Sequence, residues 1–255
     1  MPHDAYLQRR ATPATAEIIS IRDLRTHCSS CTMRELCLPV GLPPHALKQL
    51  DEIVARRIRL AKGKSLYRAG DAFSALYAIR LGSCKTTLLS DDGREQVAGY
   101  HMIGDVIGMD GIGNNRHGCD AVALEDSEYC VLPFGELEDL GRRVVPLQRN
   151  LHRFLSREIA RNHGAMLQLG SMSAEQRLAA FLINLSQRYR IRGYSSTDFV
   201  LRMTRAEIGS YLGLKLETVS RLFSRFQAEG LMLVRGREVK SLDLTGLSSL
   251  LGQRC

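Results

Sequence analysis

Three cysteines near the start of the chain, Cys28, Cys31 and Cys37, have the spacing C-x2-C-x5-C. Cysteine thiolates so close together suit zinc or an iron-sulfur cluster, and a cubane cluster usually takes four of them. In a reducing compartment such a group is more often a metal or redox centre than a set of disulfides. Spacing does not choose the fourth ligand, for which the candidates are Cys84, Cys119, Cys130 and Cys255.

A zinc site is the alternative for the same cysteines. His27 directly precedes Cys28, and three thiolates with one imidazole would satisfy tetrahedral zinc. No histidine of the chain forms a catalytic motif with a nucleophile or with a metal site, so the sequence predicts no enzyme. Cysteines that bind no metal are expected to be buried thiols, because free cysteine is among the most buried residue types.

A second group of residues, near the other end of the chain, is suited to reading DNA. Thr204 and Glu207 form a capping box, which predicts that a helix begins there. The glycine of Leu212-Gly213-Leu214 allows a sharp turn into a second helix at about 216–228. The apolar residues of that helix predict a buried face of Val219, Leu222, Phe223 and Phe226.

The opposite face of the second helix carries side chains that recognise bases. Arg221 can donate two hydrogen bonds to guanine O6 and N7, Glu217 can accept one from cytosine N4, and Ser220 can contact a base or a phosphate. Lys215 is a poor N-cap, which is one feature against a helix start at this point. The predicted DNA-contacting residues are Thr204, Glu217, Ser220, Arg221 and Arg225.

A hairpin is predicted after this helix, from runs at 231–234 and 238–242 around a basic tip, Arg235-Gly236-Arg237. Such a hairpin completes a winged helix whose wing contacts the DNA backbone. The charge agrees, because residues 173–255 hold 13 Lys and Arg against 7 Asp and Glu, whereas residues 1–172 hold 22 against 20. We therefore infer that double-stranded DNA is a partner.

The elements that must hold these two sites lie between them. Strand-like runs from about residue 44 to 135, at 76–79, 85–89, 96–100 and 128–131, alternate with glycine turns and predict an antiparallel β-roll of the jelly-roll kind. A helix follows at about 146–170, in which a seam recurs at steps of 4, 3, 4 and 3. This seam predicts a homodimer, although a helix that packs only on its own domain is the alternative. The predicted dimer seam consists of Leu155, Ile159, Asn162, Met166 and Leu169.

Length and composition limit the classes of protein to which the chain can belong. The 255 residues, 44% of them apolar, allow one to two domains. No apolar run reaches the ~18 residues of a membrane span, and the start of the chain lacks a signal-peptide pattern, so we expect a cytoplasmic protein. The predicted fold is α+β, with an N-terminal arm that carries the cysteines at 1–43, a β-roll sensor domain at 44–144, a dimerisation helix at 145–171 and a winged helix-turn-helix domain at 172–255.

Several stretches resemble the FNR (fumarate and nitrate reduction) branch of the CRP/FNR transcription regulators. In the DNA-reading region the likeness is carried by Gly209-x-Tyr211-Leu212-Gly213-Leu214 and Glu217-Thr218-Val219-Ser220-Arg221-Leu222. The cysteine spacing is similar as well. The likeness covers nearly the whole chain, since it extends to Leu76-Tyr77-Ala78-Ile79-Arg80-x-Gly82, Gly104-Asp105-x-Ile107-Gly108 and Cys130-x-Leu132-Pro133-Phe134.

The resemblance implies an oxygen-responsive global regulator of anaerobic metabolism genes, with one 4Fe-4S cluster per subunit on Cys28, Cys31, Cys37 and Cys130. In that family the cluster promotes dimerisation and binding to TTGAT-N4-ATCAA-like sites, and oxygen degrades it. Cys130 is the implied fourth ligand because it precedes a Leu-Pro-Phe run, as the family's fourth cysteine does. The turn Ser90-Asp91-Asp92-Gly93 resembles the family loop that contacts RNA polymerase.

A cyclic-nucleotide receptor of the CRP type is the competing function for the same fold. That pocket needs a glutamate shortly after the Gly-Asp-x-Ile-Gly turn and an Arg-Ser pair for the phosphate, whereas this chain has Met109 and Cys119-Asp120. A phosphate that faced Asp120 without an arginine would be desolvated and unpaired. The sequence therefore disfavours cyclic AMP as a ligand.

Asn162 departs from the family pattern, in which the dimer seam carries an acidic residue. Without paired negative charges the cluster-free dimer is less repelled, so we expect its dissociation to be incomplete. The sequence leaves open the target genes, activation or repression at each of them, and whether nitric oxide or a small ligand acts as a signal.

Overall fold

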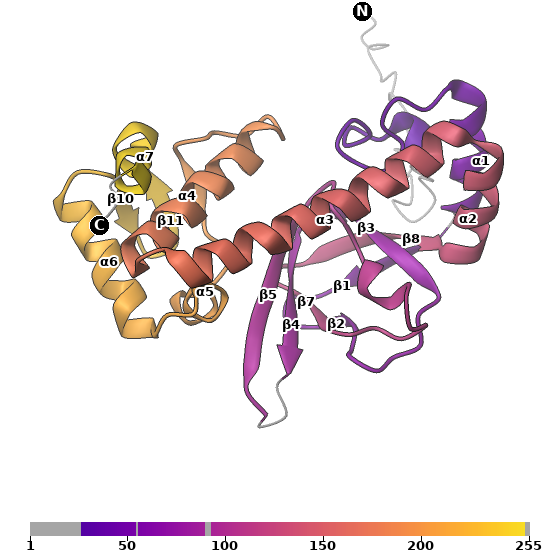
Figure 1. The fold of residues 1–255 in the computed structure, drawn as a ribbon. Helices are drawn as coiled ribbons and strands as arrows, with labels where there is room; N and C mark the ends of the chain where they lie inside the picture. The colour runs from indigo at the N-terminus through magenta and orange to yellow at the C-terminus, as the bar shows by residue number, and fades with distance from the viewer. Residues whose placement is uncertain (1–26, 55, 90–92, 253–255) are drawn as a thin grey trace, which may run out of the picture.

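The computed structural model describes residues 27–54, 56–89 and 93–252 of the 255-residue chain. Figure 1 shows a strand-rich part and a helical part joined by one long helix, α3. No helix within these described ranges is long and apolar enough to cross a membrane. The elements are η2 (Cys28–Ser30), α1 (Pro44–Ile53), β1 (Arg57–Leu60), β2 (Ser65–Tyr67), β3 (Ala75–Leu81), β4 (Ser83–Leu89), β5 (Glu95–Met102), β6 (Val106–Ile107), η3 (Met109–Gly111), β7 (Asp120–Ala123), β8 (Ser127–Pro133), α2 (Phe134–Arg143), α3 (Val145–Ser171), α4 (Ala174–Arg190), β9 (Phe199–Val200), α5 (Arg205–Leu212), α6 (Leu216–Ala228), β10 (Leu233–Arg235), β11 (Glu238–Lys240) and α7 (Leu244–Gly252).

The predicted β-roll is confirmed as two four-stranded antiparallel sheets. One sheet has the order β1-β8-β3-β6 and the other the order β2-β7-β4-β5. In the first sheet Cys130 of β8 lies opposite Arg57 of β1 and opposite Ala78 of β3. Cys130 also packs against the same apolar cluster as Cys28 and Cys37. The sheet register thus brings a cysteine from the middle of the chain to the N-terminal cysteines.

The segment from about residue 44 to 135, for which the sequence predicted only strands, begins with a helix. α1 starts at Pro44, whose ring fits the first turn of a helix, and it buries Ala46, Leu47 and Leu50. These side chains share a core with Leu38 and with residues of α2 and α3. Apolar residues at i, i+1 and i+4 fit the period of a helix, which accounts for the difference.

Asn150 attaches the cysteine-bearing segment to the start of α3. Its side chain is buried, and its amide nitrogen donates to the backbone oxygens of Leu38, at 2.9 Å, and Val40, at 2.7 Å. A buried amide is costly unless its hydrogen bonds are made, so the segment that follows Cys37 is held on α3.

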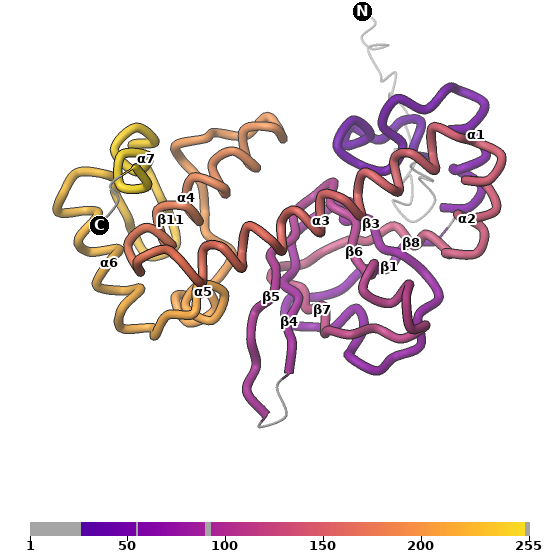
Figure 2. The backbone as a smooth tube through the Cα atoms, in the orientation of Figure 1, coloured from indigo at the N-terminus to yellow at the C-terminus, as the bar shows by residue number. Residues whose placement is uncertain are grey.

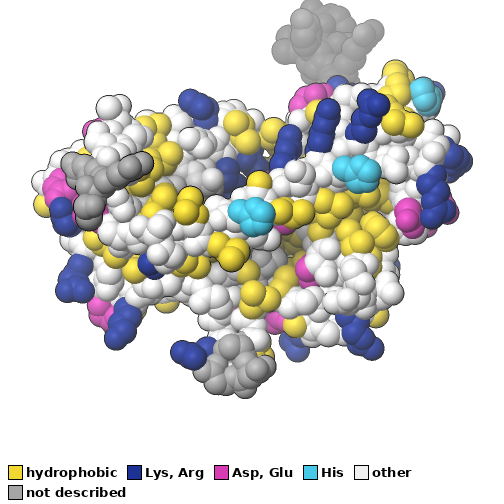
Figure 3. Space-filling model, in the orientation of Figure 1, with side chains coloured by type: hydrophobic (Ala, Val, Ile, Leu, Met, Phe, Trp, Pro, Cys, Tyr) yellow, Lys and Arg dark blue, Asp and Glu magenta, His cyan; other side chains and the backbone are white. Residues whose placement is uncertain are grey.

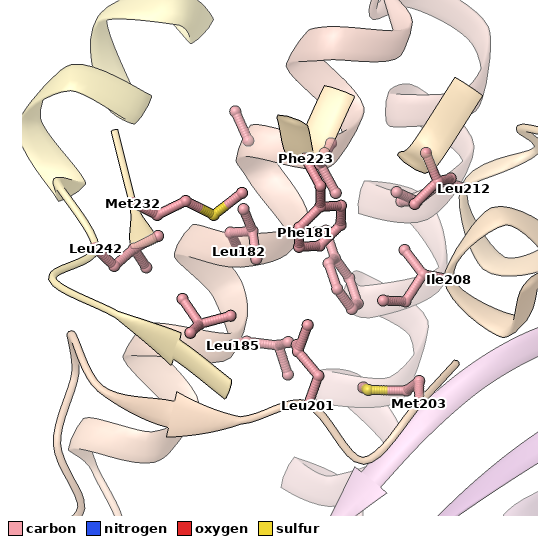
Figure 4. Close-up of a cluster of buried hydrophobic side chains, with 14 of the residues drawn as sticks. Phe181, Leu182, Leu185, Leu201, Met203, Ile208, Leu212, Phe223, Met232 and Leu242 are labelled. Atoms are coloured by element: carbon pink, nitrogen blue, oxygen red, sulfur yellow. The ribbon is translucent and has the colours of Figure 1, made fainter. Parts of the chain in front are cut away.

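Residues 174–252, called the reader domain below, form one apolar core. Figure 4 shows Phe181, Leu182 and Leu185 of α4 near Ile208 of α5 and Phe223 of α6. The first helix of the predicted pair, α5, begins after the Thr204 capping box, and the second, α6, has the predicted bounds. The bend between them requires glycine, because a Cβ on Gly209 would lie 2.6 Å from the backbone oxygen of Leu214 and because Gly213 has φ +64°.

Three elements of the reader domain had no counterpart in the sequence prediction. α4 begins at a capping box of Ser173 and Gln176, a signal that was present in the sequence. β9 adds a third strand to the predicted hairpin of β10 and β11. α7 follows that hairpin and contributes Leu247 to the reader core.

The reader domain also packs against the β-roll of its own chain, where β5 passes beside α5 (Figure 2). Val97 N donates to Ser210 Oγ at 2.9 Å, and Lys85 Nζ lies 3.2 Å from Glu207 Oε1. The ring of Tyr100 in β5 packs against that of Tyr211 in α5, with the centroids 5.2 Å apart and the ring planes at 58°. Apolar and polar contacts together thus join the two parts of the chain.

Candidate cysteine centre and DNA-reading surface

Four thiols line one cavity at the contact between the N-terminal segment and the β-roll. Cys28, Cys31 and Cys37 reach it from the segment that precedes α1, and Cys130 reaches it from β8. All four cysteines are partly buried. This space is called the cysteine cavity below, and its apolar lining includes Met33, Leu38, Leu50, Val54, Ile79 and Leu132.

Asp51 of α1 fixes the position of the first cysteine. Its carboxylate accepts from Cys28 N and, at 2.8 Å, from Ser29 Oγ. His27 also lines the cysteine cavity, and its Nδ1 lies 3.9 Å from Asp51 Oδ2. The imidazole of the zinc alternative is therefore near the same thiols.

Burial determines the ionisation of these thiols. It raises the pKa of Cys28 to about 12, with a further increase from the charge of Cys130, and it raises the pKa of Cys37 and of Cys130. A thiolate is the form that binds metals, and here it is disfavoured unless a cation compensates its charge. Metal binding at this site would therefore release protons.

Three arginines surround Glu128 beside the cysteine cavity. The Glu128 carboxylate is 2.6 Å from Arg80 Nη1, 2.9 Å from Arg59 Nε and 3.3 Å from Arg57 Nη1. Burial raises the pKa of Cys130, and the charges of Arg57 and Arg80 partly offset that increase. The net positive charge of the three arginines and Glu128 favours the thiolate form of the cysteines that line the cavity.

Cys84 and Cys119 lie in a different buried cluster, inside the β-roll. Within the described part of the chain, no group of three or more His, Cys, Asp or Glu side chains is arranged to hold a metal ion. The donor set nevertheless fits a thiolate-bound centre, because four thiols share one largely apolar cavity.

The predicted base-reading residues lie on one exposed face of α6. Glu217, Ser220 and Arg221 are exposed, whereas Val219 and Phe226 beneath them are buried. Lys215 makes no side-chain cap, yet α6 starts at the predicted residue, since the buried face of the helix holds it on the reader core. In the exposed tip Arg235-Gly236-Arg237, Arg235 ends β10, and Gly236 and Arg237 connect it to β11.

Two of the predicted DNA contacts already have partners within the chain. Thr204 Oγ1 accepts from Glu207 N at 3.2 Å and donates to Glu207 Oε2 at 2.9 Å. Arg225 lies 2.7 Å from Glu229 Oε1 and 3.1 Å from Glu175 Oε2. Both residues are exposed, so each can contact DNA only by sharing or exchanging its internal partner.

Arg205 is a structural residue of the reader domain that the sequence analysis missed. Its guanidinium carbon lies 3.2 Å from the centroid of the Phe223 ring, and its Nη2 donates to Gly236 O at 3.4 Å. Burial lowers the pKa of Arg205 to about 10. This side chain joins α5 to α6 and to the wing, and no local pattern signals it because its partners lie far along the chain.

The predicted dimer seam is largely uncovered in the single chain. Ile159 is 56% exposed and Met166 70% exposed, and Asn162 is exposed as well. Figure 3 shows hydrophobic side chains on the face over which α3 runs. Leu169 contacts the reader domain, since a Cβ on Gly213 would lie 3.1 Å from its Cδ2. Large apolar side chains left exposed along one helix are typical of an interaction surface.

A second cavity, of about 480 Å³, lies between the β-roll and α3. Asp110 and Glu158 contribute carboxylates to it, and the described residues that line it include neither Lys nor Arg. Burial lowers the pKa of His101 to about 3, so this lining histidine is neutral at pH 7. The cavity thus offers a guest molecule no cationic side chain among these lining residues, and its Glu158 carboxylate is paired with Arg161 Nη1 at 3.0 Å.

Three features of the sequence analysis lie outside the described residues. These are the arm at 1–26, residues 90–92 of the turn that resembles the polymerase-contacting loop, and Cys255.

Two domain families match the chain. The Crp-like helix-turn-helix domain matches residues 176–250, which include α5, α6 and the wing. The cyclic nucleotide-binding domain matches residues 57–143, which are the β-roll and α2.

Curated relatives are similar over most of their length. The transcriptional regulatory protein btr of Bordetella pertussis is 51% identical over 89% of this chain and 94% of its own. The transcriptional activator protein anr of Pseudomonas aeruginosa is 43% identical over 93% and 98%. The fumarate and nitrate reduction regulatory protein of Salmonella typhimurium is 42% identical over 89% and 90%. Among solved structures, FixK2 from Bradyrhizobium japonicum has a TM-score of 0.71 and 28% identity, and covers 76% of this chain and 96% of its own.

Proposed function

Because the chain belongs to the FNR-type branch of the CRP/FNR transcription regulators, we propose that it is an oxygen-responsive global regulator of anaerobic metabolism genes. It holds one 4Fe-4S cluster per subunit on Cys28, Cys31, Cys37 and Cys130, and it binds DNA as a homodimer. The polymerase contact implied by the turn at 90–93 is part of the same proposal.

The observation that carries this proposal is the shared cavity of four cysteines, one of them about a hundred residues from the others. Four thiolates are the usual ligand set of a cubane cluster. When bound, such a cluster supplies an oxygen-sensitive centre. Arg57 and Arg80 support the anionic thiolates by their charge, and the apolar lining limits the access of water.

Asn150 supports a connection between the cysteine cavity and the dimer seam. It binds the backbone of the segment that follows Cys37 and is itself a residue of α3. A change in the order of that segment therefore changes how the first turns of α3 are held. The seam residues lie further along the same helix, so both sites act on one element.

Homodimerisation is proposed through the uncovered seam of α3, with Asn162 facing its counterpart and fixing the register. A twofold dimer presents two α6 helices, and the centres of the half-sites that they read lie about one DNA turn apart. We take the sites to be of the TTGAT-N4-ATCAA kind. Affinity then rises because two half-sites are bound at once.

Cyclic AMP is disfavoured as the ligand of the β-roll. A phosphate in the 480 Å³ cavity would meet the carboxylates of Asp110 and Glu158, with no Lys or Arg among the described lining residues. The neutral His101 supplies no compensating charge. An anion buried without a cationic partner is costly, so the cavity does not suit a cyclic nucleotide.

Replacement of Arg221 by Ala should remove discrimination at one guanine of the half-site. The bidentate contact contributes about 1 to 3 kcal/mol of preference for the correct base. Titration of wild type and Arg221→Ala against the intact site and against a site with that guanine replaced measures this. If the variant binds both duplexes more weakly by the same factor, Arg221 contacts phosphate and does not read the base.

The direct test is analysis of iron and acid-labile sulfide in protein purified without oxygen, followed by admission of air. About four irons per chain, with a visible absorbance that is lost in air, is the expected result. One zinc per chain and no colour would support the alternative, a regulator with structural zinc on the same cysteines, which the position of His27 favours. Protein without bound metal would require another signal, such as a small ligand or nitric oxide acting elsewhere.

A further inference from the structure

One carboxylate, that of Asp105, lies where the β-roll meets the reader domain. It is on the tight turn that follows β5, where its Oδ2 accepts from Met102 N at 2.8 Å. Arg188 of α4 donates to Asp105 Oδ2 at 2.5 Å, and Arg192, just beyond α4, donates to Oδ1 at 2.8 Å. All three side chains are at most 15% exposed.

The two arginines bind more than the carboxylate. Arg188 Nη1 donates to Tyr100 O at 2.8 Å, and Arg192 Nε donates to Ile103 O at 2.7 Å. Each guanidinium therefore binds at two points, one backbone oxygen and one carboxylate oxygen, in β5 or in the turn that follows it. A planar guanidinium held at two points fixes the orientation of its own segment relative to the turn, as well as the distance between them.

The same turn touches the region of the cysteine cavity. Gly104 N donates to Ile79 O at 2.8 Å, and Ile79 lines that cavity. A Cβ on Gly104 would lie 3.0 Å from Cβ of Leu36, the residue before Cys37. The Gly104-Asp105 turn is thus in contact with the cysteine segment on one side and with the reader domain on the other.

A buried ion pair of this kind adds little net stability, because the cost of removing the charges from water offsets their attraction. The ion pair instead disfavours every arrangement of the β-roll and the reader domain in which one of these charges is buried without its partner. The arginines belong to the reader domain and the carboxylate to the β-roll, so the penalised arrangements are those with the reader domain at another angle.

We propose that Asp105, acting through Arg188 and Arg192, is a positioning residue that holds the reader domain at one angle to the β-roll and α3, and thereby sets the half-site spacing that the dimer accepts. The inference rests on the proposed binding of two half-sites by a homodimer. Asp105 lies in the interior of the chain and contacts no DNA; it acts on where α6 is presented.

The test compares wild type with the double variant Arg188→Gln/Arg192→Gln and with Asp105→Asn. The asparagine retains an oxygen for Met102 N but directs an amide towards Arg192, so the turn is kept and the ion pair is lost. Arg190→Gln is the control for the loss of positive charge from α4, because Arg190 is exposed on the same helix; it removes one of the two charges that the double variant removes. Three duplexes are titrated: a single TTGAT half-site, TTGAT-N4-ATCAA, and the latter with one base pair added between the half-sites.

For both ion-pair variants we expect half-site affinity within about twofold of the Arg190→Gln control, and affinity for the two-half-site duplex lowered by about 10-fold or more. The preference of wild type for the correct spacing should be largely lost. A variant that is merely destabilised would lose affinity for all three duplexes alike. Retention of the spacing preference by both variants overturns the proposal.

A second measurement, made without DNA, tests whether Asp105 holds the reader domain on the β-roll. Its result does not depend on whether the protein binds two half-sites together. Hydrogen–deuterium exchange of the full-length protein reports on residues 95–102 and 205–212, which face each other at the contact between the two parts. Faster exchange there in both ion-pair variants, with exchange in α6 unchanged, is expected. Unchanged exchange in residues 95–102 and 205–212 would show that Asp105 does not hold the domains together.

Discussion

Replacement of Cys130 by Ser is expected to abolish cluster retention and to lower the affinity for the two-half-site duplex by about 100-fold or more. Cys130 is the thiol that the β-roll contributes to the cysteine cavity. A serine hydroxyl is a poor ligand for a soft metal centre, so the iron content of protein purified without oxygen should fall from about four per chain towards zero. Iron analysis and DNA titration under the same anaerobic conditions measure both effects.

Cys119→Ser is the control, because Cys119 is a thiol buried inside the β-roll, away from that cavity. It should keep its iron and its DNA affinity. Equal iron loss in the two variants would mean that the substitutions act through folding and that Cys130 is not a ligand. Gel filtration of Cys130→Ser at micromolar concentration also tests the role of Asn162, since monomer alone would contradict a persistent cluster-free dimer.

Replacement of Ile159 by Glu is expected to convert the protein to monomer and to lower affinity for the two-half-site duplex by about 100-fold or more, with little effect on a single half-site. Ile159 is a large apolar side chain of the predicted seam, one step before Asn162, and is 56% exposed in the single chain. Two glutamates placed opposite each other would repel and would be desolvated. Analytical ultracentrifugation and DNA titration provide the two readouts.

Ala160→Glu is the control for Ile159→Glu. Ala160 is exposed on the same turn of α3 but lies off the seam, so it adds the same charge without entering the dimer contact. A dimeric Ala160→Glu beside a monomeric Ile159→Glu would support the seam. If Ile159→Glu remains dimeric, the dimer uses another surface, and α3 packs only within its own chain.

Local patterns in the sequence were sufficient to predict the helix pair of the reader domain. A capping box at Thr204, a glycine at position 213 and the apolar period of Val219, Phe223 and Phe226 all act within one or two turns of helix. Four of the strands of the β-roll, β3, β4, β5 and β8, were found for the same reason. α1 was missed because its short apolar run lies at the edge of a strand-rich segment.

Contacts between distant residues were beyond the reach of such patterns. In the sequence, Asn150 is one of many polar residues of an amphipathic helix. Only the fold shows that its side chain is buried against the segment after Cys37. Asp105 and Arg188 are 83 residues apart in the chain. The fourth cysteine was chosen by resemblance, since spacing left Cys84, Cys119, Cys130 and Cys255 equally open.

The length of α3 has a consequence for which changes the protein can tolerate. The helix runs unbroken for 27 residues, about 40 Å, and each residue turns it by about 100°. One residue inserted between the seam and Ser171 would rotate the reader domain by about 100° relative to the twofold axis of the proposed dimer. Seven inserted residues would restore its rotational phase to within about 20°. The same seven residues would also displace the reader domain by about 10 Å along the helix, away from its contacts with β5. Changes in the length of α3 should therefore be tolerated less well than substitutions at positions outside the seam.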